Sequence, residues 1–143
     1  MINECCQIRP DLPHGPLSIL IAEDAVPSLE MLEFILKSFG HKVVAKAKNG
    51  EEAIRLAKKH RPDLIILDID MPDMDGLEAA EQILAERNVP IIIATGITRD
   101  EALVRASKLN IQSYLIKPYR NLQIETSISL AMIRHHQITQ PPV

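Results

Sequence analysis

The stretch that decides the fold lies at residues 64–76 and reads LIILDIDMPDMDG. Its first four residues are apolar without interruption, which is typical of a strand buried on both faces of a parallel sheet. Asp68 follows directly, and the stretch closes with Asp75 and Gly76, a pair that commonly shapes a turn and opens a helix. The stretch therefore predicts a buried strand, an acidic loop and then a helix.

Four more strand-sized apolar blocks give the chain a regular spacing. With the central block they span residues 17–22, 42–47, 63–67, 90–94 and 112–116. Amphipathic segments with helical spacing follow them, at residues 27–39, 51–60, 74–86, 99–109 and 121–137. Strands that alternate with helices form βαβ units and a parallel sheet. We predict an α/β fold, a doubly wound five-stranded parallel sheet with flanking helices.

Short patterns predict where the helices begin and end. Asn49 and Thr98 each stand three residues before a Glu, which is the capping-box spacing. Gly40 takes the place at which glycine commonly ends a helix. We interpret His41 and His60 as surface residues that cap helix ends.

Length and composition indicate one folded domain. The chain has 143 residues, of which 46% are hydrophobic and 24% charged, as in a compact globular protein. The proline-rich start has no periodicity and predicts a flexible leader at residues 1–16. The domain proper is expected at residues 17–138, and residues 139–143 form a tail or linker stub.

Charge, cysteine content and hydropathy exclude several classes of protein. The net charge of -3 provides no basic field for nucleic acid. No apolar run approaches the roughly 18 residues of a membrane span, and the start lacks a signal peptide. Cys5 and Cys6 are adjacent and cannot form a stapling framework. We expect a cytoplasmic protein without direct contact to nucleic acid or membrane.

Polar side chains collect where the predicted strands end. Glu23 and Asp24 follow the first strand, and Asp68 ends the third. Thr95 follows the fourth strand and Lys117 follows the fifth. Because ligands of such sheets bind beyond the carboxyl ends of the strands, these five residues predict one site at one edge.

The residue types at this edge indicate phosphoryl transfer. Three carboxylates repel one another unless a cation lies among them, and oxygen ligands without His or Cys favour Mg²⁺. A carboxylate such as Asp68 can attack phosphorus. Lys117 can then balance the charge of the phosphoryl oxygens while the hydroxyl of Thr95 positions one of them.

These residues resemble the receiver domain of bacterial two-component response regulators, of the chemotaxis-regulator type. The resemblance covers about residues 17–137 and rests on four motifs in the same order and spacing. They are ILIAED at 19–24, LDIDMPDMDG at 67–76, ATG at 94–96 and YLIKPY at 114–119.

The resemblance implies a role in phosphorelay signal transduction. Asp68 would accept a phosphoryl group from a sensor histidine kinase or a phosphotransfer protein. Glu23, Asp24 and Asp68 would hold Mg²⁺ together with the main-chain carbonyl of Asp70, and no other cofactor is expected. Lys117 would bind the phosphoryl oxygens.

The resemblance also implies how the signal leaves the site. Thr95 would be a switch hydroxyl and Tyr114 an aromatic that changes rotamer with it, although Tyr114 could equally be a packing residue. The bond between Lys117 and Pro118 is expected to be cis. A surface formed by the fourth helix, fifth strand and fifth helix would contact a downstream target or a fused domain, or form a homodimer. Such a protein is a phosphoacceptor signalling domain rather than a conventional enzyme, assisting only its own phosphorylation and slow autodephosphorylation.

Two alternative functions stay open at this point. A haloacid-dehalogenase-type phosphatase also has an Asp two residues after its nucleophile, as Asp70 follows Asp68. In that pattern the metal-binding acid pair comes last, however, whereas Glu23 and Asp24 come first. A degenerate receiver that binds partners without phosphate is the other alternative, and the complete set of acids, Thr95 and Lys117 argues against it.

Two further features have plain interpretations. Asp73 and Asp75 could be metal ligands, but Asp75 more often serves as a turn and helix-cap residue. Residues 58–61, which read KKHR, are expected to be a solvated helix end, because they lack the interleaved aromatic residues of a nucleic-acid site.

Overall fold

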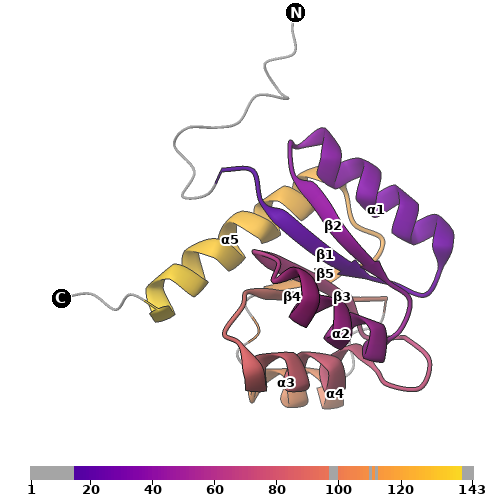
Figure 1. The fold of residues 1–143 in the computed structure, drawn as a ribbon, viewed down its shortest axis with the longest axis vertical. Coiled ribbons are helices and arrows are strands. Elements are labelled where there is room, and N and C mark those ends of the chain that lie inside the picture. Colours follow the sequence, from indigo (N-terminus) through magenta and orange to yellow (C-terminus); the bar gives the residue numbers. More distant parts are fainter. Residues whose placement is uncertain (1–14, 97–99, 110, 112, 140–143) are drawn as a thin grey trace, which may run out of the picture.

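The computed structural model describes residues 15–96, 100–109, 111 and 113–139. Within them, five strands alternate with five helices (Figure 1). The strands are β1 (Ser18–Ala22), β2 (Lys42–Ala47), β3 (Leu64–Asp68), β4 (Ile91–Thr95) and β5 (Ser113–Ile116). The helices are α1 (Val26–Ser38), α2 (Gly50–His60), α3 (Gly76–Glu86), α4 (Asp100–Ser107) and α5 (Asn121–Thr139). Most of the predicted leader, with Cys5 and Cys6, and residues 140–143 of the predicted tail lie outside the described residues.

The strands form one sheet in the order β2-β1-β3-β4-β5, and every neighbouring pair is parallel. The chain moves outward from β1 to β2 and then returns past β1 to β3, so the direction of winding reverses between β1 and β3. This is the predicted doubly wound sheet, and the strand bounds agree with the prediction within one residue. The reversal creates a crevice at the carboxyl ends of β1 and β3, where ligands of such sheets bind.

Helices cover both faces of the sheet (Figure 1). Helices α1 and α5 pack on one face against alternate strand residues such as Ile19, Ile21 and Ile66. Helices α2, α3 and α4 pack on the other face, against residues such as Leu20 and Leu67. Strands β3 and β4 are buried at every position, which explains why their sequences are continuously apolar.

Two of the predicted helix ends are confirmed, and one lies outside the described residues. Gly40 follows α1 with φ 90°, and its N–H donates to Lys37 O at 3.0 Å, as expected of a left-handed glycine after a helix. Asn49 caps α2, because its Oδ1 accepts from Glu52 N at 2.8 Å. The Thr98–Glu101 pattern begins at a residue that is not described.

The start of α3 differs from the prediction, which placed it at Met74. The helix begins at Gly76, because Asp75 takes the N-cap position and its Oδ1 accepts from Glu78 N at 2.8 Å. The preceding residues form tight turns, with Asp73 at φ 70° and Met74 N donating to Pro72 O at 2.8 Å. The turn-and-cap interpretation of Asp75 is therefore confirmed.

The prediction that His41 lies at the surface is wrong. Its side chain is buried between the start of β1 and α5. Nδ1 accepts from Leu17 N at 3.1 Å, and Nε2 lies 3.4 Å from Glu125 Oε1. A backbone N–H at the start of β1 needs an acceptor there, and the His41 ring supplies it.

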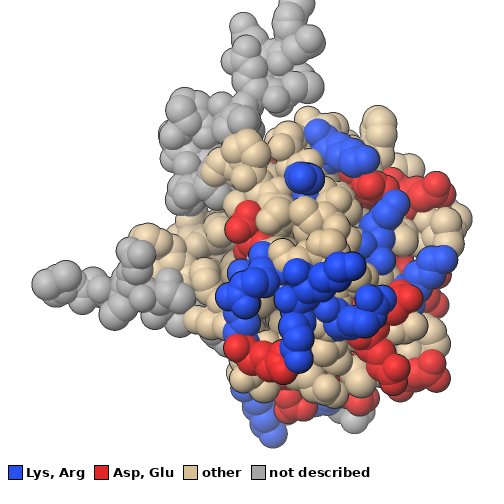
Figure 2. Space-filling model, in the orientation of Figure 1, with Lys and Arg blue, Asp and Glu red and all other residues tan. Residues whose placement is uncertain are grey.

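Basic side chains gather on the face that Figure 2 shows, over the region of α2 in Figure 1. Lys58, Arg61 and Arg87 line a hollow of about 250 Å³ between α2 and α3, and Lys58 Nζ lies 3.2 Å from Glu86 Oε1. Cations near the end of α2 interact favourably with the carbonyl end of the helix dipole. Among the described residues, no helix is both long and apolar enough to cross a membrane.

Candidate functional site

The structure brings the predicted site residues to the carboxyl edge of the sheet. Glu23 and Asp24 follow β1, Asp68 ends β3, Thr95 ends β4 and Lys117 follows β5. The strand order sets their neighbours: β3 lies between β1 and β4, and Asp68 is in register with Ala94. These five residues therefore share the edge at which the sequence predicts a site, and their roles there stay predictions.

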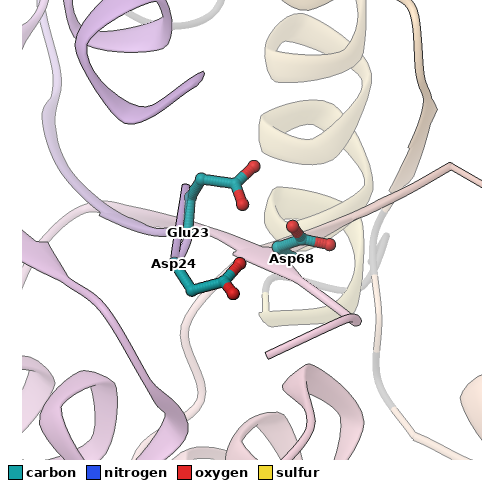
Figure 3. Close-up of side chains that lie close together, drawn as sticks. All are labelled: Glu23, Asp24 and Asp68. Carbon is teal, nitrogen blue, oxygen red and sulfur yellow. The ribbon is translucent and has the colours of Figure 1, made fainter. Parts of the chain in front are cut away.

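Three carboxylates meet in the crevice between β1 and β3. Glu23, Asp24 and Asp68 each offer one oxygen, and these three atoms lie within 4.8 Å of one another. Figure 3 shows the carboxyl groups turned toward one another from the ends of the two strands. Glu23 and Asp68 are buried, whereas Asp24 is exposed. The cluster is thus open to solvent on the Asp24 side.

Lys117 connects two of these carboxylates. Its Nζ donates to Glu23 Oε1 at 2.6 Å and to Asp68 Oδ2 at 2.9 Å. The peptide bond between Lys117 and Pro118 is cis, as predicted, and Lys117 N donates to Thr95 O at 2.8 Å. Lys117 directly follows β5, and its side-chain hydrogen bonds place the amine against Asp68. The contact between Lys117 and Glu23 was not predicted. The Glu23 side chain is one methylene longer than that of an Asp, and the sequence does not indicate which group it reaches.

The charges of this cluster depend on one another. Burial raises the pKa of Glu23, and the neighbouring Asp68 carboxyl raises it further, while Lys117 opposes the shift. Burial lowers the pKa of Lys117, but hydrogen bonds and charge from Asp68 and Glu23 outweigh it and hold the pKa above its usual value. Lys117 is therefore a firmly charged ammonium between two acids.

The main chain fixes the orientation of the Asp68 carboxylate. Asp70 N donates to Asp68 Oδ1 at 3.0 Å, while Lys117 contacts the other oxygen. Ile69 N donates to Ala94 O at 3.0 Å and keeps the loop after β3 against β4. The main chain of Asp70 thus contacts the carboxylate cluster. The proposed role of its carbonyl as a metal ligand stays a prediction.

The two predicted switch residues lie on neighbouring strands. Thr95 is buried with 7% exposure at the end of β4, whereas Tyr114 on β5 is 38% exposed. Ile93 of β4 is in register with Tyr114. Tyr114 lines a groove of about 660 Å³ between β5 and α5. The roles of Thr95 and Tyr114 in switching stay predictions.

Tyr119 is a neighbour of the site to which the sequence analysis gave no role. It is partly buried against the core beneath α1 and α5. The pKa of its hydroxyl is raised, mainly by burial and further by the charges of Glu23 and Asp68, while the charge of Lys117 opposes the increase. Its place two residues after Lys117 was the available signal.

Gly76 allows α3 to lie directly on the peptide that carries Asp68. A Cβ at Gly76 would overlap with Asp68 O and would lie 2.9 Å from Asp68 C and 3.1 Å from Ile69 Cα. All three atoms belong to the main chain and cannot rotate away, as the end of a flexible side chain could. Gly76 is therefore required for the close approach of α3 to the acidic loop.

We expect Gly76→Ala to lower the free energy of unfolding by about 3 kcal/mol, because the new methyl group forces the backbone at Asp68 to move. Gly96→Ala is the matched control, since nothing lies within 4 Å of a Cβ at Gly96. Urea unfolding of both variants measures the effect. Equal stability of Gly76→Ala and the wild type would contradict the packing described here.

Comparison with known proteins identifies a family. The family described as response regulator receiver domain matches residues 19–129. The transcriptional regulatory protein PdtaR of Mycobacterium tuberculosis is 37% identical over 125 residues, which are 87% of this chain and 60% of that protein. The chemotaxis protein CheY of Listeria monocytogenes is 36% identical over 105 residues, which are 73% of this chain and 88% of that protein. The chain thus spans somewhat over half of PdtaR and most of CheY.

Solved structures show the same architecture. The signal receiver domain of a modulated diguanylate cyclase from Desulfovibrio desulfuricans G20 superposes with a TM-score of 0.80 at 34% identity, covering 87% of this chain and 99% of that one. A chain of the CheX–CheY–BeF3–Mg²⁺ complex from Borrelia burgdorferi superposes with a TM-score of 0.75 at 26% identity, covering 79% and 87%. Five-stranded parallel sheets with flanking helices are therefore common to this chain and these structures.

Proposed function

Because the chain belongs to the receiver domain family of response regulators, we propose that it accepts a phosphoryl group on Asp68. The observation that carries the proposal is the 2.9 Å ion pair between Lys117 Nζ and Asp68 Oδ2, at the edge where Glu23 and Asp24 also lie. In such a site the buried Asp68 carboxylate can act as the nucleophile, and the Lys117 ammonium can stabilise the negative charge of the phosphoryl oxygens. The two further acids can hold a metal ion beside them. The chain is a signalling domain, and Asp68 is its proposed input site.

In the proposed reaction, a carboxylate oxygen of Asp68 attacks the phosphorus of a phosphohistidine. A P–O bond forms to Asp68, the P–N bond breaks, and its electron pair returns to the imidazole nitrogen. The hydrogen bonds from Asp70 N and Lys117 Nζ hold the carboxylate in one orientation before the attack. Lys117 then donates hydrogen bonds to the phosphoryl oxygens and balances their charge.

Mg²⁺ fits the donor set of this site. Glu23, Asp24 and Asp68 bring three carboxylate oxygens within 4.8 Å of one another, and hard oxygen donors suit this ion. These residues would hold it, with the main-chain carbonyl of Asp70 as a further ligand. When bound, the ion would neutralise part of the charge on the carboxylates and the phosphoryl oxygens. The solved Borrelia burgdorferi complex, which contains BeF3 and Mg²⁺, supports this assignment by similarity.

Thr95 and Tyr114 are the proposed switch residues. The Thr95 side chain is buried at the end of β4, next to the strand of Asp68, so its hydroxyl is suited to bind a phosphoryl oxygen. Tyr114 lines the groove between β5 and α5 and therefore belongs to the surface expected to contact a target. A rotamer change of Tyr114 would alter the shape of that groove.

The partners of the domain follow from its family and are part of the proposal. A sensor histidine kinase or phosphotransfer protein would donate the phosphoryl group, and slow autodephosphorylation would remove it. The output would be a downstream protein, a second copy of the chain, or a fused domain. We propose that the protein acts in the cytoplasm and through protein contacts rather than direct contact with nucleic acid.

Incubation with acetyl phosphate, followed by intact mass spectrometry, tests this function. With Mg²⁺ present the protein should gain one phosphoryl group, and chelation of the ion should prevent most of the gain, because the repulsion among the three carboxylates then goes unbalanced. Absence of an adduct would instead support a degenerate receiver. Rapid multiple turnover of a general phosphatase substrate would support the phosphatase alternative.

A further inference from the structure

Helix α3 is attached to the proposed phosphoacceptor through its first turn. Gly76 N donates to Ile69 O at 3.1 Å, and the Cα of Gly76 faces the Asp68 carbonyl at a distance that leaves no room for a methyl group. A displacement of this turn would therefore move the peptide that carries Asp68. Contacts that fix the first turn of α3 therefore also fix the position of Asp68.

Asp75 holds this turn with one carboxylate that has two functions. Oδ1 caps α3 by accepting from Glu78 N at 2.8 Å. Oδ2 accepts from Arg105 Nη1 at 3.1 Å, and Oδ1 also lies 3.4 Å from Arg105 Nη2. The two terminal nitrogens of the guanidinium thus face the two carboxylate oxygens, the geometry that gives an Arg–carboxylate pair its directionality.

Arg105 comes from α4, which begins at the same edge of the sheet as α3. Helical side chains lean toward the N-terminus of their helix, so Arg105 reaches toward the carboxyl edge, where Asp75 lies. It lines a hollow of about 190 Å³ together with Leu77, Glu81, Lys108 and Leu109. The adjacent Ala106 is buried in the core. The position of Arg105 is therefore tied to the packing of α4 on the sheet.

We propose that Arg105 is a positioning residue for phosphorylation, because its ion pair with Asp75 fixes α4 against the first turn of α3, which packs on the peptide that carries Asp68. The proposal rests on the proposed function of Asp68. Phosphorylation of Asp68 then alters the stability of α4, and by reciprocity a change at α4 alters the equilibrium of Asp68 phosphorylation. The rate of phosphorylation changes as well, because displacement of the Asp68 peptide moves the carboxylate away from its attacking orientation. The coupling path consists of Asp68, Gly76, Asp75 and Arg105.

Three variants separate the ion pair from other effects. Arg105→Met removes the charge and keeps an unbranched apolar chain in the hollow. Asp75→Asn also removes the charge but retains a side-chain oxygen, and asparagine is as good an N-cap as aspartate. Lys108→Met is the matched control, because Lys108 is a cation that lines the same hollow and is not the cation that Asp75 binds.

Hydrogen exchange of the α4 amides is the first measurement, made before and after reaction with acetyl phosphate and Mg²⁺. In the unmodified protein, Arg105→Met and Asp75→Asn should each speed exchange about threefold, as expected for a partly exposed ion pair. Both should reduce the change in exchange that phosphorylation causes to less than half of the wild-type change. The double variant should behave like either single variant, because the two residues act through one contact.

The initial rate of phosphorylation is the second measurement. We expect it to fall about threefold in Arg105→Met and Asp75→Asn, to recover in part in Arg105→Lys, and to stay unchanged in Lys108→Met. Wild-type behaviour of Arg105→Met, or an equal effect of Lys108→Met, would overturn the proposal. Failure of the proposed function is distinguishable from this, because the wild type itself would then gain no phosphoryl group.

Discussion

Asp68→Asn should abolish the gain of a phosphoryl group from acetyl phosphate. The amide nitrogen carries no negative charge and the amide oxygen is a poor nucleophile, so no stable P–O bond forms. The fold should survive, because asparagine fills nearly the same volume as aspartate. Its side-chain oxygen can also accept the hydrogen bond that Asp70 N donates to Asp68 Oδ1 in the wild type. Removal of one of three clustered carboxylates also reduces their repulsion. Intact mass spectrometry measures the loss, and thermal unfolding checks the fold.

Asp73→Asn is the matched control for this experiment. Asp73 lies in the same acidic loop but outside the carboxylate cluster, and asparagine tolerates its φ of 70°. The control should gain the phosphoryl group like the wild type. A full gain of mass in Asp68→Asn would show that another residue is the acceptor.

Lys117→Met should slow phosphorylation of Asp68 by about 100-fold, the usual scale for loss of one preorganised donor to developing negative charge. The wild-type amine contacts both Glu23 and Asp68, so its removal also leaves two buried carboxylates without their cation. We therefore expect a lower thermal midpoint as well, with a part of the loss recovered when Mg²⁺ is added.

The initial rate at saturating Mg²⁺ measures the effect of Lys117→Met on the chemistry apart from its effect on the fold. Arg120→Met is the control, because it removes an exposed cation only three residues away in sequence. A rate for Lys117→Met within about threefold of the wild-type rate would mean that the amine does not stabilise the transferred group.

Most of the fold could be predicted because its signals are local. The runs at residues 64–67 and 91–93 are apolar throughout, since β3 and β4 are covered on both faces. Gly40 and Asn49 mark helix ends by intrinsic backbone and hydrogen-bond preferences, which do not depend on the rest of the molecule. The carboxyl-edge rule then placed the site residues together without any knowledge of distances.

The parts that could not be predicted depend on contacts between distant segments. His41 is buried because its ring accepts a hydrogen bond from Leu17 and faces Glu125, 84 residues away. The ion pair of Asp75 with Arg105 joins residues 30 positions apart. The start of α3 was misplaced for a related reason: Met74 is apolar and suits a helix, but the tight turns after Asp68 and the cap at Asp75 delay the helix to Gly76.

The position of the phosphoryl group tests the central claim most directly. The protein is incubated with acetyl phosphate and Mg²⁺, reduced with borohydride, which converts an aspartyl phosphate to homoserine, and digested for peptide mass spectrometry. We expect homoserine at position 68 and at no other aspartate. Homoserine at position 24 or 70, or none in protein that retains its fold, would contradict it.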